Sequence, residues 1–171
     1  MALIGVMSDS HDNIWAVWEA ARIFRDRDVE MVVHLGDIVA PFTLRALHEA
    51  GVQRLVAVYG NNCGERLGLS RTAAALGYEI EEWPHSLEVD GRRLLLVHGS
   101  GPPEKTIAMV EALATSQRWD AVLYGHTHRV DNRRIGDVLV LNPGETCGCL
   151  TGKKTVAILD TATMEAEVVT L

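Results

Sequence analysis

Short apolar runs alternate with helix-like periodicities through the first half of the chain. The runs at 3–7, 30–35 and 54–59 predict strands, and apolar residues recur at helical spacing over 14–21, 43–50 and 66–76. Asp12 stands just before the first helical segment and is the expected N-cap. This alternation of strands and helices is typical of a parallel sheet covered by helices.

The second half of the chain contains hairpin signals instead. Asp90-Gly91 separates runs at 86–89 and 93–97, and Gly136-Asp137 separates runs at 130–135 and 138–141. Such pairs of residues favour tight two-residue turns between antiparallel strands. A helix after Pro103, a strand over 121–124 and a closing hairpin over 155–160 and 165–170 complete the prediction, which is an α/β sandwich with a mixed sheet.

Length and composition limit what this chain can do. Its 171 residues predict a single domain over 1–171, and a formal charge of −7 argues against binding nucleic acid in bulk. No run approaches the roughly 18 apolar residues of a membrane span, and the first residues lack the basic start of a secretory signal. Three cysteines fit a reducing compartment, and the pair Cys147 and Cys149 does not by itself indicate a structural zinc site. We therefore expect a cytoplasmic protein without a membrane partner.

Five of the predicted strands are followed at once by side chains that bind metals. These segments are Ser8-Asp9-Ser10-His11, Gly36-Asp37, Gly60-Asn61, His98-Gly99 and Gly125-His126-Thr127-His128. Ligands of open α/β sheets bind beyond the carboxyl ends of the strands, so the five loops are expected to meet at one edge. Within each i, i+2 pair, extended backbone would point both side chains to the same side. The preceding glycines would allow tight turns at a crowded site.

The number and type of these donors predict two metal ions. A single tetrahedral ion needs four ligands, whereas seven suit two ions that share a carboxylate. A donor set rich in histidine favours manganese, iron, zinc or cobalt over an all-oxygen calcium or magnesium site. Manganese is the expected metal, with iron, zinc, nickel, cobalt and magnesium as alternatives. The predicted metal ligands are Asp9, His11, Asp37, Asn61, His98, His126 and His128.

The motifs D-x-H, GD, GN, HG and GHTH, in this order, resemble the calcineurin-like metallophosphoesterase superfamily. The resemblance runs from residue 1 to the Asn142-Pro143-Gly144 turn and is strongest for the small single-domain phosphodiesterases of bacteria and archaea. It implies a four-layer αββα sandwich of mixed β-sheets flanked by helices. It also implies that Asp9, His11 and His128 hold one metal, that Asn61, His98 and His126 hold the other, and that Asp37 bridges them.

The implied activity is hydrolysis of phosphodiester bonds by a hydroxide that bridges the two metals, with Asp37, Asn61 and His98 as the expected catalytic residues. Many relatives have a histidine after the GN motif that protonates the leaving group, but here Asn62 and Cys63 follow. An amide is a poor general acid, and this favours diesters with good leaving groups. A second departure is Glu145, where the resemblance predicts a serine and where we expect an altered pocket rim.

Two other functions are compatible with the same motifs. A phosphomonoesterase or nucleotide phosphatase would use the same metal site, although the missing histidine after Asn61 argues against it. A non-catalytic protein-binding scaffold would share the fold, but such relatives tend to lose ligands, and this chain retains all seven. The expected partners are a small phosphodiester substrate and further copies of this chain in a homo-oligomer. His34 is expected in the core or behind the ligands, not among them.

Overall fold

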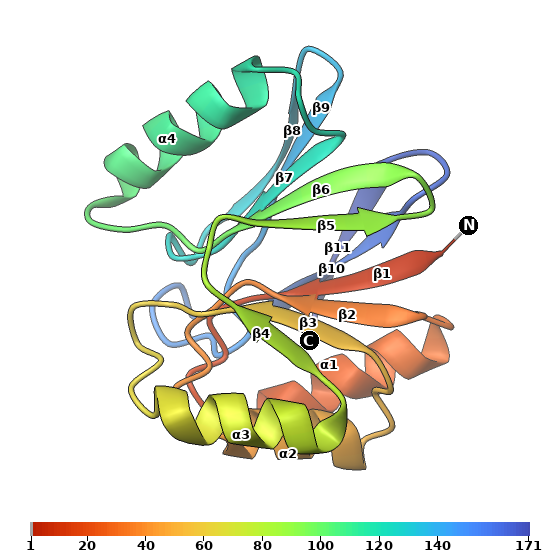
Figure 1. The fold of residues 1–171 in the computed structure, drawn as a ribbon, viewed down its shortest axis with the longest axis vertical. Coiled ribbons are helices and arrows are strands. Elements are labelled where there is room, and N and C mark those ends of the chain that lie inside the picture. Colours follow the sequence, from red (N-terminus) through yellow and green to blue (C-terminus); the bar gives the residue numbers. More distant parts are fainter. Residues whose placement is uncertain (1) are drawn as a thin grey trace.

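Two β-sheets stack face to face, and helices cover the outer face of each sheet (Figure 1). The computed structural model describes residues 2–171. The first sheet has six strands in the order β11-β10-β1-β2-β3-β4. Its strands are β1 (Leu3–Met7), β2 (Met31–His34), β3 (Leu55–Val58), β4 (Glu79–Glu81), β10 (Thr155–Asp160) and β11 (Glu165–Thr170).

The second sheet has five strands in the order β5-β6-β7-β9-β8. They are β5 (His85–Val89), β6 (Arg92–Val97), β7 (Ala121–Tyr124), β8 (Val130–Ile135) and β9 (Val138–Pro143). Three helices lie below the first sheet, α1 (Ile14–Asp26), α2 (Phe42–Glu49) and α3 (Arg66–Leu76), and α4 (Pro103–Thr115) lies on the second (Figure 1). This is the four-layer αββα sandwich that the resemblance implied.

The buried apolar residues form three layers that hold the sandwich together. Phe24 and Leu47 belong to the layer between the first sheet and its helices. Ile4 and Leu96 belong to the layer between the two sheets, and Val110 belongs to the one beneath α4. Strands such as β1 and β7 are buried on both faces, which explains why they read as continuous apolar runs and not as alternating ones.

The strand pairing places the loops that matter at one edge. Strands β1, β2 and β3 are mutually parallel, as are β6 and β7, so the carboxyl ends within each set point the same way. The backbone N–H of His126, after β7, donates to Asp9 Oδ2, after β1, at 3.1 Å, and so the ends of the two sheets meet. The hairpins predicted at Asp90-Gly91 and Gly136-Asp137 are confirmed by the antiparallel pairs β5–β6 and β8–β9.

Two local expectations were wrong or incomplete. Asn13, not Asp12, caps α1, because its side chain accepts the N–H of Ala16, whereas Asp12 lies in left-handed backbone and accepts the hydroxyl of Thr43. Strand β4 was not predicted, since its three residues are exposed or half-buried and it is defined by pairing with β3. Over residues 2–171, every helix is too short or too polar to cross a bilayer.

Candidate metal centre

The predicted ligands come together, but not through extended backbone. Five of the seven adopt positive φ angles, namely Asp9 at 51°, His11 at 42°, Asp37 at 57°, His126 at 67° and His128 at 60°. The expectation that each i, i+2 pair lies in an extended segment is therefore wrong. Left-handed backbone is uncommon for residues other than glycine and concentrates at functional sites, where the surrounding fold offsets its cost.

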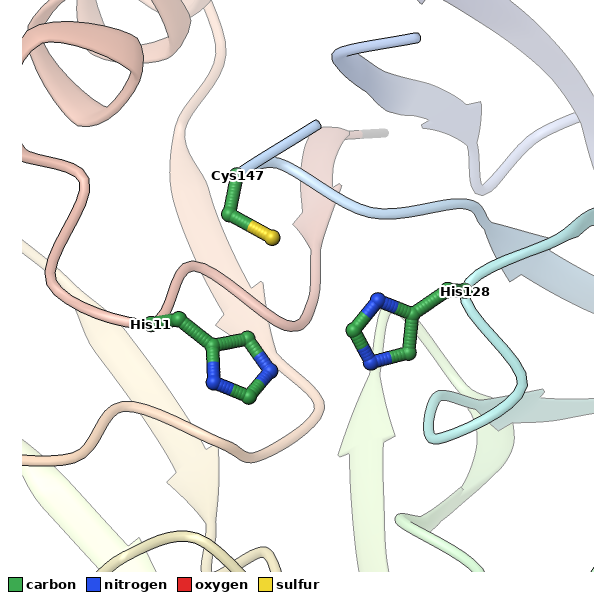
Figure 2. A group of neighbouring side chains, drawn as sticks. All are labelled: His11, His128 and Cys147. Carbon is green, nitrogen blue, oxygen red and sulfur yellow. The ribbon is translucent and has the colours of Figure 1, made fainter. Parts of the chain in front are cut away.

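One group of donors lies where β1, β2 and β7 end. Ligand atoms of Asp9, His11, Asp37 and His128 all lie within 4.8 Å of one another. His128 Nε2 is 3.3 Å from Asp9 Oδ1, and His11 Nε2 is 3.4 Å from Asp37 Oδ2. Asp9 Oδ1 and His11 Nε2 are buried without a hydrogen-bond partner among the described residues. In Figure 2 the rings of His11 and His128 face each other across the site.

A second group meets at the side-chain oxygen of Asn61. His98 Nε2 and His126 Nδ1 each lie 3.0 Å from Asn61 Oδ1. The other ring nitrogens face backbone carbonyls, at 2.6 Å for His98 Nδ1 to Leu35 and at 2.7 Å for His126 Nε2 to Gly101. A carbonyl can only accept, so the outer nitrogens carry the protons. With their inner nitrogens deprotonated, both rings would direct a lone pair towards a cation that the amide oxygen of Asn61 also contacts.

Asp37 lies between the two groups. Its Oδ2 faces His11, and its Oδ1 is 3.3 Å from His98 Nε2. Burial would raise the pKa of Asp37, but the contact with His98 and hydrogen bonds from Asn62 hold it well below the usual range. The carboxylate is therefore ionised and placed to contact cations on both sides.

The electrostatics of the site also fit bound cations. Burial raises the pKa of Asp9, since a carboxylate in an apolar interior lacks its hydration. Within residues 2–171, no lysine or arginine forms an ion pair with Asp9 or Asp37. Buried carboxylates are normally paired with a cation or coordinate a metal. The donors present, with their unpartnered atoms, are therefore a chemically suitable set for divalent metals.

Two glycines are required here by space and not by backbone conformation. A Cβ on Gly60 would lie 2.2 Å from both the backbone nitrogen and Oδ1 of Asp37, and one on Gly125 would lie 2.1 Å from Ser8 Oγ. Of the three glycines that precede predicted ligands, Gly36, Gly60 and Gly125, only Gly36, at φ 99°, has the left-handed conformation that we expected of a tight turn. The ligand loops thus approach one another too closely for any side chain.

Asn62 stands after the GN motif, where the resemblance led us to expect a histidine as general acid in many relatives, and here it orients the predicted ligand Asp37. Its backbone N–H donates to Asp37 Oδ1 at 2.7 Å, and its side-chain amide donates to Oδ2 at 2.9 Å. The amide is therefore engaged with the shared carboxylate. It supplies no proton donor of the kind that a histidine would offer to a leaving group.

His34 lies behind the ligands, as expected, and is fully buried. Its Nε2 is 2.9 Å from Ser10 Oγ, and its Nδ1 accepts the N–H of Gly36 at 3.2 Å. Burial, together with the nearby His98, lowers the pKa of His34 to about 3. The ring is neutral at pH 7 and braces the two loops that carry Asp9 and Asp37.

We expected Glu145 to alter the pocket rim, but the residue lies in the interior, behind His128. Glu145 is fully buried, and its Oε2 lies 2.6 Å from His128 Nδ1. Burial alone would raise the pKa of Glu145, but hydrogen bonds from His128, Thr151 and Leu150 lower it to about 2. Asn142, near the end of β9, is also buried. Its side chain donates to Gly125 O and Thr127 Oγ1, and these bonds connect the end of β9 to the GHTH loop.

The two neighbouring cysteines have different surroundings. Cys147 is buried, and its sulfur lies within 4.8 Å of a ring nitrogen of His11 and of a ring nitrogen of His128. Figure 2 shows these three neighbouring side chains. Cys149 is exposed. In the part of the chain that the structure describes, Cys149 belongs to no group of possible ligands, so the two cysteines do not act as a pair.

Comparison with known proteins agrees with this geometry. Residues 2–164 match the model of the calcineurin-like phosphoesterase superfamily domain. A phosphodiesterase from Methanocaldococcus jannaschii is 38% identical over 164 residues, which are 95% of each chain. The solved structure of an archaeal phosphodiesterase is 37% identical, with a TM-score of 0.89 over 99% of each chain. An E. coli phosphoesterase, 21% identical over 98% of each chain with a TM-score of 0.69, shares the fold. The chain belongs to the calcineurin-like phosphoesterase superfamily.

Proposed function

We propose that this protein is a metal-dependent phosphodiesterase that binds two divalent cations, with Asp37 as the shared ligand. The observation that carries the proposal is the convergence of two donor groups on opposite oxygens of one ionised, buried carboxylate. Asp9, His11 and His128 would hold one cation. Asn61, His98 and His126 would hold the other. The 38% identity to a named phosphodiesterase supports this function.

When bound, the two cations would acidify a water molecule and neutralise charge on the phosphoryl oxygens. The protein's own part is to place and orient the donors. Backbone carbonyls fix the rings of His98 and His126, and Asn62 fixes Asp37. Asn61 is exposed, and with its oxygen turned to the rings its side-chain N–H group can donate to a phosphate oxygen. Asp37, Asn61 and His98 are the residues that we propose to be catalytic.

The preference for diesters with good leaving groups rests on Asn62. Its amide is held by Asp37, so the GN loop supplies no acid for the leaving group. Missing general acid catalysis costs on the order of 10²–10⁴-fold when the leaving group is poor. We propose Mn²⁺ as the metal, a small phosphodiester as the substrate, one domain over residues 1–171 and the cytoplasm as the location. The exposed indole of Trp15 supports a homo-oligomer.

Hydrolysis of a chromogenic phosphodiester and its monoester counterpart tests this function. Metal-stripped protein, the same protein with Mn²⁺ restored, and Asp37→Asn with Mn²⁺ should be compared. We expect diester hydrolysis only in the restored wild type, because the variant lacks the shared carboxylate. If folded protein showed no activity with any divalent metal, the proposed enzymatic function would be rejected. A non-catalytic protein-binding scaffold would then be favoured.

A further inference from the structure

Glu145 is a buried carboxylate to which every hydrogen-bonding neighbour donates. Its oxygens accept from the Leu150 N–H at 3.0 and 3.1 Å, the Thr151 N–H at 2.6 Å, the Thr151 hydroxyl at 2.7 Å and the Cys147 thiol at 3.2 Å. The remaining contact is the 2.6 Å approach of His128 Nδ1. A group this well supplied with donors is fixed in position before any metal binds.

The contact with His128 determines which nitrogen of the ring carries the proton. An ionised carboxylate can only accept, so the Nδ1 that contacts Glu145 carries a proton. Nε2 is then the nitrogen left to bind a cation, and it lies 3.3 Å from Asp9 Oδ1, a buried atom without a hydrogen-bond partner among the described residues. His98 and His126 are oriented by backbone carbonyls, whereas His128 depends on a side chain that substitution can remove.

The loop that carries Glu145 also joins the two halves of this donor group. The N–H of Thr146 donates to Ser8 O at 2.9 Å, and the N–H of Cys147 donates to Asp9 O at 3.1 Å. The loop from β9 is thus bonded to the backbone that presents Asp9, while its Glu145 side chain holds His128 from the GHTH loop. This short segment therefore contacts predicted ligands of both sheets, Asp9 after β1 and His128 after β7.

We propose that Glu145 is a positioning residue that fixes the Nδ1–H tautomer of His128 and thereby enables the Asp9, His11 and His128 group to bind its cation. This inference rests on the proposed metal site and goes beyond the ligands themselves. Carboxylates that bond to the outer nitrogen of a metal-binding histidine orient the ring and increase its basicity, and their removal typically costs 10- to 100-fold in metal affinity or activity. In Glu145→Gln, the amide N–H group would face Nδ1 and favour the Nε2–H tautomer, which cannot bind the cation.

Two measurements on the full chain test this role. The first is the tautomer of His128 in the metal-free protein, read from nitrogen-15 NMR of the imidazole rings. We expect Nδ1–H in the wild type and Nε2–H in Glu145→Gln. Because the wild-type spectrum is informative alone, an Nε2–H tautomer there would overturn the proposal even if the variant failed to fold.

The second measurement is calorimetric titration of metal-free protein with Mn²⁺ alone. We expect Glu145→Gln to bind one of two ions 10- to 100-fold more weakly and the other with unchanged affinity. Glu111→Gln is the matched control, because it makes the same substitution on α4, where Glu111 pairs with Arg133. This variant should retain two tight sites.

The outcomes separate this inference from the proposed function. If Glu145→Gln binds both ions with wild-type affinity, or if Glu111→Gln loses one ion equally, the positioning role is rejected while diester hydrolysis by the wild type can still stand. If the wild type binds two ions and shows the expected tautomer but hydrolyses no diester, the function fails and the role of Glu145 remains.

Discussion

Replacing Gly60 by alanine should disable the site without unfolding the protein. The added Cβ would lie 2.2 Å from both the backbone nitrogen and Oδ1 of Asp37, and 2.9 Å from His98 Cε1. Ordinary van der Waals contact begins at 3.4 Å, so the separation from Asp37 must grow by about 1.2 Å, the difference between 3.4 and 2.2 Å. Asp37 is the proposed shared ligand, so both donor groups would lose their geometry together.

The size of the effect follows from that displacement. A misplacement of about 1 Å can cost 10²-fold in rate, so we expect kcat/KM for a chromogenic diester to fall by about 10²-fold. This corresponds to about 2.7 kcal/mol of transition-state stabilisation. Overpacking should also lower the free energy of unfolding by about 1–3 kcal/mol, which leaves most domains folded at 25 °C.

Gly64→Ala is the matched control, because it lies in the same loop and a Cβ there would meet nothing within 4 Å. The two variants should be compared for Mn²⁺ content, diester hydrolysis and thermal unfolding. Gly64→Ala should behave as the wild type. Wild-type kcat/KM with two bound ions in Gly60→Ala would show that the loop can move without disturbing Asp37, and would refute the reasoning.

Three further predictions concern the buried His34, stabilisation by metal, and the three cysteines. His34 has a pKa of about 3 when folded against 6.5 when unfolded, so the unfolded chain binds an extra proton as the pH falls from 6.5 to about 3, and stability is lost there. Urea unfolding of His34→Asn should show a pH slope shallower by about 1.4 kcal/mol per unit over that range, and an unchanged slope would contradict a neutral buried ring. Mn²⁺ at 100 times its Kd should stabilise metal-stripped protein by about 2.7 kcal/mol per ion and raise Tm by roughly 5–11 °C per ion, whereas Asp37→Asn should show little shift. A thiol reagent should label one cysteine, Cys149, in the native protein and all three after denaturation, and rapid native labelling of Cys147 would contradict its burial.

Strands that are buried on both faces were predictable, because such burial requires consecutive apolar residues. Strands β1, β7 and β10 match the expected ranges, since each contains an apolar run between polar turns. Strand β4 could not be predicted, because its residues form a strand only through pairing with β3 in the folded sheet. The cap of α1 was misassigned because Asp12 and Asn13 are both good capping residues, and the tertiary contact with Thr43 engages Asp12.

The site could be predicted as a set of residues but not as a geometry. Donors at the ends of parallel strands had to share an edge, and the structure brings all seven together. Their left-handed backbone was not foreseen, because positive φ in aspartate and histidine depends on the surrounding loops and leaves no mark in the sequence. The burial of Glu145 was not foreseen for a related reason, since a glutamate after a turn normally lies on the surface, and its burial depends on the loop that returns to Asp9.

The distribution of ligands over the two sheets links the proposed metal binding to the stability of the sandwich. Asp9 and His11 follow β1 of the first sheet, whereas His128 follows β7 of the second, and Asn61 likewise faces two histidines from the second sheet. Each cation would therefore contact ligands from both sheets. It would bind at the edge where left-handed turns and buried carboxylates lower the stability of the fold. Binding energy would offset that local strain only while ligands from both sheets are in place. Across ligand variants, the Mn²⁺-dependent rise in Tm and the diester activity should then fall together, and a variant that kept the full rise without activity would show that metal binding and catalysis depend on different residues.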